Sequence, residues 1–203
     1  MDIKQVRAIK QLKRLEKLVE NNKIRLAAEW DEKWKILIST ILSSQTRDEV
    51  TILVSEKLYD RYPTLKKLAK AKLVDVKKII KPVNFYKTKA KNIIETAKLI
   101  KNKIPETREE LMKLPGVGWK VSNVYLYEAY HIDCIGVDTH VARLAGKLGW
   151  SKEEDKHKIE LDLEKLFPKK YRGMINPVLV RFGRIYGTRR KREDEILKSL
   201  VIC

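Results

Sequence analysis

Apolar side chains recur at helical spacing along nearly the whole chain, and this pattern restricts the fold more than any other feature. In the first segment they follow one another every three positions, at Ile3, Val6, Ile9, Leu12, Leu15 and Leu18. This spacing predicts an amphipathic helix, and the mostly apolar residues 34–43 predict a buried one. No stretch alternates apolar and polar residues between tight hairpin turns, as half-buried strands do. The sequence therefore predicts an all-α protein.

Short polar motifs indicate where several helices begin. Residues 46–49 and 107–110 both have the capping-box pattern, in which a threonine hydroxyl accepts a hydrogen bond from a backbone amide of the first turn. Asp138 or Thr139 is expected to cap a later helix, because short side chains with an oxygen are favoured at that position.

Positive charge dominates the sequence. The 203 residues include 45 lysines and arginines against 27 aspartates and glutamates, which gives a net charge of +18. A lysine- and glutamate-rich thermophile surface would explain many charges but not this surplus. The excess favours a polyanionic partner such as a nucleic acid.

The sequence has no secretory or membrane-spanning pattern. Residues 1–22 are charged throughout and lack the apolar stretch of a signal peptide. Cys134 and Cys203 are the only cysteines, which is neither a disulfide framework nor a four-cysteine metal site. We expect an intracellular protein of the cytoplasm or nucleoid, with no membrane partner and with a monomeric state as the default.

A glycine-containing turn, Leu-Pro-Gly-Val-Gly at residues 114–118, separates two helical patterns. Glycine has no Cβ, so the backbone amides of such a turn can approach a phosphate closely. Lys120 follows at the start of the second helix, and Asp138 stands at the start of a later one. A turn that holds phosphate, an amine and a carboxylate suit chemistry on the bond between sugar and base in DNA.

Together these motifs resemble the helix-hairpin-helix (HhH-GPD) DNA glycosylases, and in particular their endonuclease III branch, from about Trp34 to the last residue. The resemblance implies a six-helix domain over about residues 26–133 that contains the hairpin. Residues 1–25 and 134–203 would form a second helical domain, with the active cleft between the two. The implied partner is damaged double-stranded DNA.

The resemblance assigns the chemistry to Lys120 and Asp138. Lys120, as a free amine, would attack C1′ of the nucleoside, form a Schiff base and eliminate the 3′ phosphate. Asp138 would stabilise the positive charge that develops on the sugar. The alternatives are a surface lysine and an aspartate that only caps its helix; capping is compatible with catalysis.

The resemblance also implies which residues contact DNA, because a base buried in the duplex has to be flipped out. Gln45 would fill the gap, and Phe85, where relatives often have leucine, would wedge beside the opposite base. Lys87 and Lys89 would face phosphates or be solvated. The alternatives are an ordinary polar loop at Gln45 and a core position for Phe85.

Further contacts are implied around the two catalytic residues. The backbone of the hairpin would bind DNA through Gly116, Val117 and Gly118. A monovalent cation would be held by the main-chain carbonyls of Met112, Leu114 and Val117. His140 belongs to the DNA-binding motif, and a structural hydrogen bond is its expected role.

Endonuclease III relatives commonly end in four cysteines that hold a [4Fe–4S] cluster. The corresponding positions here are Gly187, Asp194, Leu197 and Cys203. Three of the four ligands are absent, so we expect no cluster. The basic tail, which includes Arg189 and Arg190, either contacts DNA without iron or is a solvated run of charge. At Trp119 the chain has tryptophan where relatives more usually have arginine, directly before the lysine. This difference leaves the identity of the damaged base undetermined.

The sequence thus predicts a bifunctional DNA glycosylase and AP lyase of base excision repair that removes oxidised pyrimidines such as thymine glycol. One alternative is the same chemistry on oxidised guanine, uracil, hypoxanthine or a mismatched base. Two non-enzymatic possibilities also stay open: a non-catalytic helix-hairpin-helix DNA-binding protein and an RNA-associated basic protein.

Overall fold

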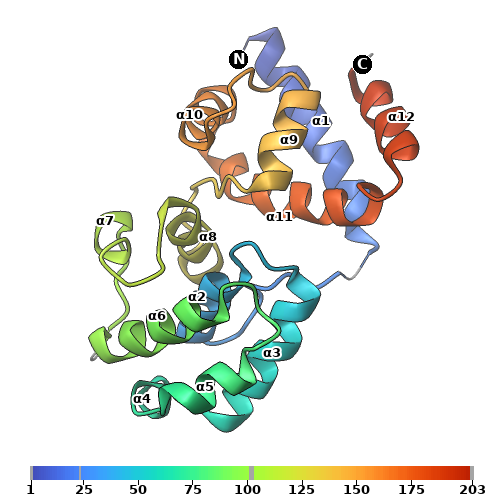
Figure 1. The fold of residues 1–203 in the computed structure, drawn as a ribbon. Coiled ribbons are helices and arrows are strands. Elements are labelled where there is room, and N and C mark those ends of the chain that lie inside the picture. Colours follow the sequence, from blue (N-terminus) through green and yellow to red (C-terminus); the bar gives the residue numbers. More distant parts are fainter. Residues whose placement is uncertain (1, 23, 101–102, 202–203) are drawn as a thin grey trace. The chain divides into compact units, whose positions relative to one another are not determined.

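The computed structural model describes residues 2–22, 24–100 and 103–201, and these residues form helices and loops without any strand (Figure 1). The prediction of an all-α protein is confirmed. Cys203 lies outside the described residues. The chain divides into two compact units, Arg25–His131 and the combination of Met1–Ile24 with Ile132–Cys203. These limits lie close to the expected domain boundaries, and the independence of each unit as a domain stays a prediction.

The unit Arg25–His131 is built around a helix that is apolar on nearly all sides. Its seven described helices, one more than the six expected, are α2 (Lys33–Ser43), α3 (Asp48–Arg61), α4 (Leu65–Ala69), α5 (Leu73–Ile79), α6 (Tyr86–Leu99), α7 (Arg108–Leu111) and α8 (Trp119–Tyr130). Helix α2 packs against α3, α6 and α8, and its side chains from Ile36 to Leu42 are all buried. A helix that is apolar all round is stable only when neighbours cover every face.

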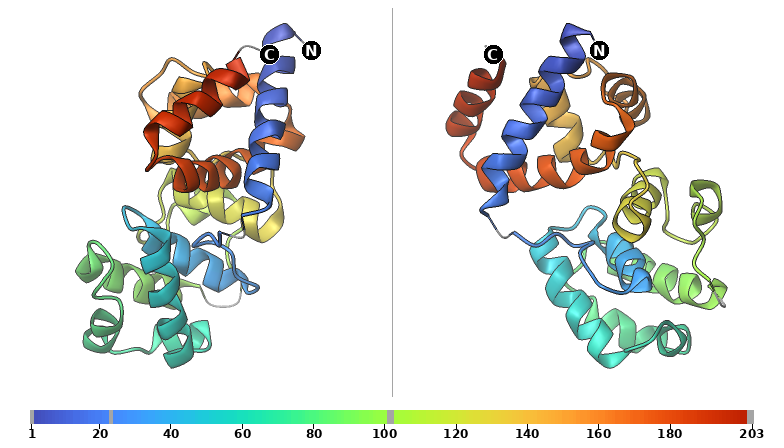
Figure 2. Two further views of the ribbon diagram at one scale, coloured as in Figure 1. Left: turned by 90° about the vertical axis from the view of Figure 1, so that its right-hand side faces the viewer. Right: turned by 180° about the vertical axis from the view of Figure 1, so that it is seen from behind.

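The described helices of the other unit pack into a bundle (Figure 2). Its helices are α1 (Ile3–Glu20), α9 (Thr139–Lys147), α10 (Lys156–Leu166), α11 (Lys169–Tyr186) and α12 (Arg190–Val201). Helix α11 contacts each of the other four, and its fully buried Phe182 lies in the common core with Leu12 of α1 and Leu144 of α9. Among the described helices, none is long and apolar enough to cross a membrane.

The apolar stripe of α1 is narrower than its three-residue spacing suggested. Leu12 and Leu15 are fully buried, but Ile3 is 90% exposed and Leu18 is 38% exposed. A step of three residues falls short of a full helical turn by about 60°, so successive members of the series drift around the helix. Val19 takes the buried position at the end of the helix instead.

Two of the expected helix caps are confirmed and one is wrong. The Thr107 hydroxyl accepts from the backbone amide of Glu110, and the Asp138 carboxylate caps α9. Thr46 does not cap α3. The N-cap residue is Arg47, one position later, and its side chain makes no capping hydrogen bond. The Thr46 hydroxyl instead accepts hydrogen bonds from Asn84 and Lys89.

Candidate active site

The hairpin between α7 and α8 is closed by local contacts. The amide of Val117 donates to the carbonyl of Leu114 at 3.1 Å. Gly116 has a φ of +80°, where side chains with a Cβ are disfavoured. A Cβ there would also lie 2.8 Å from Nδ2 of Asn92 and 3.1 Å from Cγ2 of Ile41. Both the backbone conformation and the packing against α6 and α2 therefore require glycine at this position.

Gly118 differs from Gly116, because nothing in the described part of the chain requires it to be glycine. It is the N-cap of α8, its φ is −106°, and a Cβ built on it would meet no atom within 4 Å. The amides of the first turn of α8 have no partner within the helix, and the helix dipole places partial positive charge at this end. Gly118 thus leaves room for an anion beside that end.

Lys120 is the second residue of α8, so the hairpin places it at the helix N-terminus. The guanidinium of Arg108, in α7, lies 4.3 Å from the ring centroid of the preceding Trp119. A cation over an indole ring is attracted to it, and this contact joins α7 to α8. Trp119 nevertheless remains 37% exposed.

The carbonyls of Met112, Leu114 and Val117 belong to the residues between α7 and α8. The Leu114 carbonyl already accepts the hydrogen bond that closes the turn and keeps one further lone pair. The monovalent cation stays a prediction.

The side chain of Asp138 caps the N-terminus of α9, and this hydrogen bond fixes its position. Its Oδ1 accepts from the backbone amide of Val141 at 2.8 Å. The segment that leads to Asp138 is anchored on α11, because the side-chain amide of Asn176 donates to the carbonyl of Gly136. The capping role of Asp138 is confirmed, and its catalytic role stays a prediction.

His140 lies against α11 at a glycine. A Cβ on Gly183 would fall 2.2 Å from Nδ1 of His140, so only glycine lets the imidazole pack this closely. This contact anchors the first turn of α9, and the structural hydrogen bond expected of His140 stays a prediction. Lys120 and Asp138 belong to different units, and their meeting in one cleft stays a prediction.

Gln45 and Phe85 both occupy left-handed backbone, with φ of 54° and 57°. Phe85 is 64% exposed, so the alternative of a core position is wrong. The side-chain amide of Asn84 donates to the Gln45 carbonyl, and the Asn84 backbone amide donates to the Thr46 hydroxyl at 3.2 Å. The loop between α2 and α3 therefore lies beside the loop that precedes α6.

Lys89 is not solvated, so that alternative in the prediction for this residue is wrong, and its contact with a phosphate stays a prediction. It is only 6% exposed, and its ammonium donates to oxygens at the end of α2 and in the loop that follows it, whereas Lys87 is exposed. Sequence reasoning missed Asn84 and Thr46 as partners in this contact. The misleading signal was the capping-box pattern, which assigned the Thr46 hydroxyl to its own helix.

The positions that would hold cluster ligands are used for packing or ion pairs. A Cβ on Gly187 would lie 2.2 Å from the Gly183 carbonyl oxygen, Leu197 is buried in the core, and Asp194 pairs with Lys147 at 2.7 Å. These three residues do not fit an iron–sulfur cluster. Arg189 and Arg190 are exposed between α11 and the start of α12.

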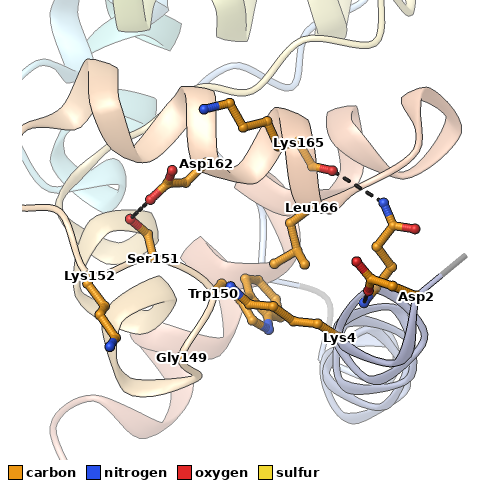
Figure 3. Close-up of a pocket in the computed structure, with 10 residues that line it drawn as sticks. Asp2, Lys4, Gly149, Trp150, Ser151, Lys152, Asp162, Lys165 and Leu166 are labelled. Carbon is orange, nitrogen blue, oxygen red and sulfur yellow. Dashed lines mark hydrogen bonds between the residues drawn. The ribbon is translucent and has the colours of Figure 1, made fainter.

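A surface pocket lies elsewhere, between α1, α10 and the loop that follows α9 (Figure 3). Lys4, Trp150 and Lys165 are among its lining residues. None of the site residues predicted from the sequence lines it. The pocket is therefore separate from the candidate chemistry.

Comparison with known proteins places this geometry in a family. Residues 38–169 match the model of the HhH-GPD superfamily base excision DNA repair proteins. Endonuclease III of Thermotoga maritima is 42% identical over 155 residues, which cover 74% of this chain and 73% of that protein. Endonuclease III of Synechocystis is 40% identical over 139 residues, 66% of this chain and 64% of the relative.

Solved structures agree with the sequence relatives. A trapped covalent intermediate of endonuclease III with DNA has a TM-score of 0.82 and 29% identity, over 91% of this chain and 88% of that one. The chain therefore belongs to the HhH-GPD superfamily of base excision DNA repair proteins, and its relatives include endonuclease III.

Proposed function

We propose that the chain is a DNA glycosylase with AP lyase activity that removes oxidised pyrimidines from duplex DNA. The observation that carries this proposal is Lys120 at the N-terminus of α8, two residues after Gly118, where nothing in the described part of the chain requires glycine. The proposed lyase chemistry requires an amine that can reach C1′ of the bound nucleotide, whereas a protein that only binds DNA needs no such lysine. The covalent intermediate trapped for endonuclease III supports the same chemistry.

In the proposed reaction, the neutral amine of Lys120 attacks C1′ of the damaged nucleotide. The new C–N bond forms as the glycosidic bond breaks, and the base leaves with the bonding electrons and gains a proton. Ring opening gives a protonated Schiff base between Lys120 and C1′. Loss of a proton from C2′ then expels the 3′ phosphate, and water later releases the lysine.

Asp138 would act through its charge. The sugar becomes positively charged as the base departs, and a nearby carboxylate stabilises that charge. Capping of α9 engages Oδ1 with a backbone amide, which orients the carboxylate. Its negative charge remains available to the sugar.

DNA binding would combine the hairpin with the net charge of +18. The amides around Gly118 would contact a phosphate, and Gln45 and Phe85 would enter the base stack. Both of these side chains are exposed, as that role requires.

We also propose that the reaction proceeds without an iron–sulfur cluster. The poor fit of Gly187, Asp194 and Leu197 to cluster ligands supports this proposal. No step of the proposed reaction uses such a group. Purified protein should therefore lack stoichiometric iron and absorbance near 400 nm; bound iron would contradict the proposal.

The test is borohydride trapping on two duplexes, one with thymine glycol and one with an abasic site. Borohydride reduces a Schiff base to a stable amine, so protein and DNA become cross-linked. We expect adducts on both duplexes, their loss in Lys120→Ala, and their retention in Lys91→Ala, which removes an exposed lysine of α6.

Each other outcome redirects the proposal. Adducts on the abasic duplex alone would keep the lyase chemistry and point to another base, such as oxidised guanine, uracil or hypoxanthine. Adducts on neither duplex would contradict the role of Lys120 and leave a glycosylase without lyase activity or a DNA-binding protein.

A further inference from the structure

Gln45 and Phe85 require support from outside their own loops. Each has left-handed backbone, which is unfavourable for a residue with a Cβ and persists only where surrounding contacts hold it. Gln45 lies between α2 and α3, and Phe85 lies directly before α6. The two loops are distant in the sequence, so tertiary contacts have to bring them together.

Three side chains, Thr46, Asn84 and Lys89, supply these contacts, and we call them the loop bridge. Asn84 donates to the Gln45 carbonyl and to the Thr46 hydroxyl. From the first turn of α6, the Lys89 ammonium donates to three oxygens: the carbonyl of Leu42 at 2.7 Å, the carbonyl of Ser44, and the hydroxyl of Thr46 at 3.1 Å. The Thr46 hydroxyl therefore accepts from both Asn84 and Lys89.

Lys89 is suited to this position because an ammonium has three donors and here meets three acceptors. Burial lowers its pKa to about 8, with a smaller contribution from the positive charge of Lys120. At neutral pH the group is therefore mostly protonated and donates to all three oxygens. It also satisfies the carbonyl of Leu42, near the C-terminal end of α2, where a cation is favoured by the helix dipole.

We propose that Lys89 is a positioning residue for opening the duplex, which acts through the loop bridge to hold Gln45 and Phe85 in one relative arrangement. The inference rests on the proposed function, in which these two residues enter the base stack. Two side chains that enter the base stack together contribute more binding free energy when their loops are already ordered, because ordering the loops during binding costs conformational entropy. The Lys89 ammonium donates to three protein oxygens, so its proposed role is to position other residues and not to act on the substrate.

The test separates the opening of a base pair from the chemistry on the sugar. Lys89→Met removes the ammonium at similar length, and Thr46→Val removes the shared hydroxyl at similar volume. Lys91→Met, an exposed lysine two residues further along α6, is the matched control. Excision from a thymine glycol duplex is compared with borohydride trapping on a single-stranded abasic oligonucleotide, which has no base pair to open.

We expect Lys89→Met and Thr46→Val to slow excision from the duplex by about 10- to 100-fold, as misplaced groups do, while single-strand trapping changes by less than about twofold. A second readout is the fluorescence of 2-aminopurine placed opposite an abasic-site analogue. Insertion beside this base unstacks it and raises its fluorescence. Saturating wild-type protein and Lys91→Met should raise the signal, and Lys89→Met should raise it much less.

Equal losses on duplex and single strand would mean that Lys89 only stabilises its unit, and would overturn the inference. Wild-type rates for Lys89→Met on the duplex would overturn it as well. If the wild-type protein processes neither substrate, the proposed function fails, and the fluorescence of 2-aminopurine then decides about the loop bridge. A signal that wild type raises and Lys89→Met does not raise supports the loop bridge. A signal that Lys89→Met raises as wild type does, or that no variant raises, overturns it.

Discussion

Glu193 provides a strong test of how the C-terminal helix α12 is held in its unit. Its side chain is fully buried at the start of α12, where both carboxylate oxygens accept hydrogen bonds from α9. Arg143 binds both oxygens, with Nη2 to Oε2 at 2.8 Å, and Nζ of Lys147 lies 2.8 Å from Oε1. We therefore change Glu193 to Gln, which keeps the shape and removes the charge.

The magnitude follows from the burial of the three partners. Breaking a buried ion pair costs about 3–5 kcal/mol, because the remaining charges lose their compensation. The side chains of Arg143 and Lys147 are 38% and 35% exposed, so water recovers part of that loss. We expect Glu193→Gln to lower the free energy of unfolding by about 2–4 kcal/mol. For a chain of this length, about 3 kcal/mol corresponds to a fall in Tm of about 6–12 °C.

The loss should depend on pH in a defined direction. Burial disfavours the ionised Glu193 carboxylate, but the hydrogen bonds from Arg143 and Lys147 outweigh it, so its pKa is lowered from 4.5. Stabilisation by a carboxylate with a depressed pKa is fully present above the unfolded-state pKa and is lost as pH falls through the folded-state value. The difference between wild type and Glu193→Gln should therefore be constant near neutrality and shrink in acid.

The assay is thermal and urea unfolding followed by circular dichroism, at neutral pH and in acid. Asp194→Asn is the matched control, because Asp194 binds the same Lys147 at 2.7 Å but is 49% exposed. An exposed pair of this kind contributes about 0–1 kcal/mol. If Glu193→Gln is no more destabilising than Asp194→Asn, or if its deficit does not shrink in acid, the reasoning about α12 is refuted.

Three further predictions concern the glycines and the charge. Gly183→Ala should cost about 1–3 kcal/mol of stability by displacing His140, whereas Gly146→Ala, with no atom within 4 Å, should stabilise α9 by about 0.5–1 kcal/mol; equal melting temperatures would contradict this. Gly118→Ala should cost at most about 1 kcal/mol of stability but weaken binding to abasic DNA about tenfold, as measured by fluorescence anisotropy. Unchanged affinity would contradict the proposal that a phosphate lies close to the backbone at Gly118. Affinity for undamaged duplex should fall with salt at a log–log slope of roughly −4 to −5 if about 5 phosphates are neutralised, and a flat response would refute the electrostatic account.

The helices and their caps were largely predictable because they depend on neighbours in the sequence. Helical spacing predicted α2 over nearly its true length, and Thr107 and Asp138 cap the helices they precede. The same local rules failed at Thr46, whose hydroxyl accepts hydrogen bonds from residues about forty positions away. A capping pattern cannot show that a distant loop competes for the same oxygen.

Side-chain burial was harder to predict than secondary structure. Lys89 and Lys87 stand two positions apart in one lysine-rich helix, and only the structure separates the buried from the exposed one. Glu193 lies in a run of charge that reads as solvated, but its carboxylate is fully buried between two cations. Ionisable groups are buried only where partners compensate them, and those partners come from other helices.

By itself the sequence determined an all-helical chain, a tight glycine turn before Lys120, an aspartate that caps α9, and a large positive charge. These features follow from spacing, backbone sterics and charge count, which need only neighbouring residues or composition. The tertiary structure alone decided that Lys89 joins two loops, that Phe85 is exposed and that Glu193 anchors α12. Each of these depends on hydrogen bonds or packing between segments about forty residues or more apart, which no local pattern encodes.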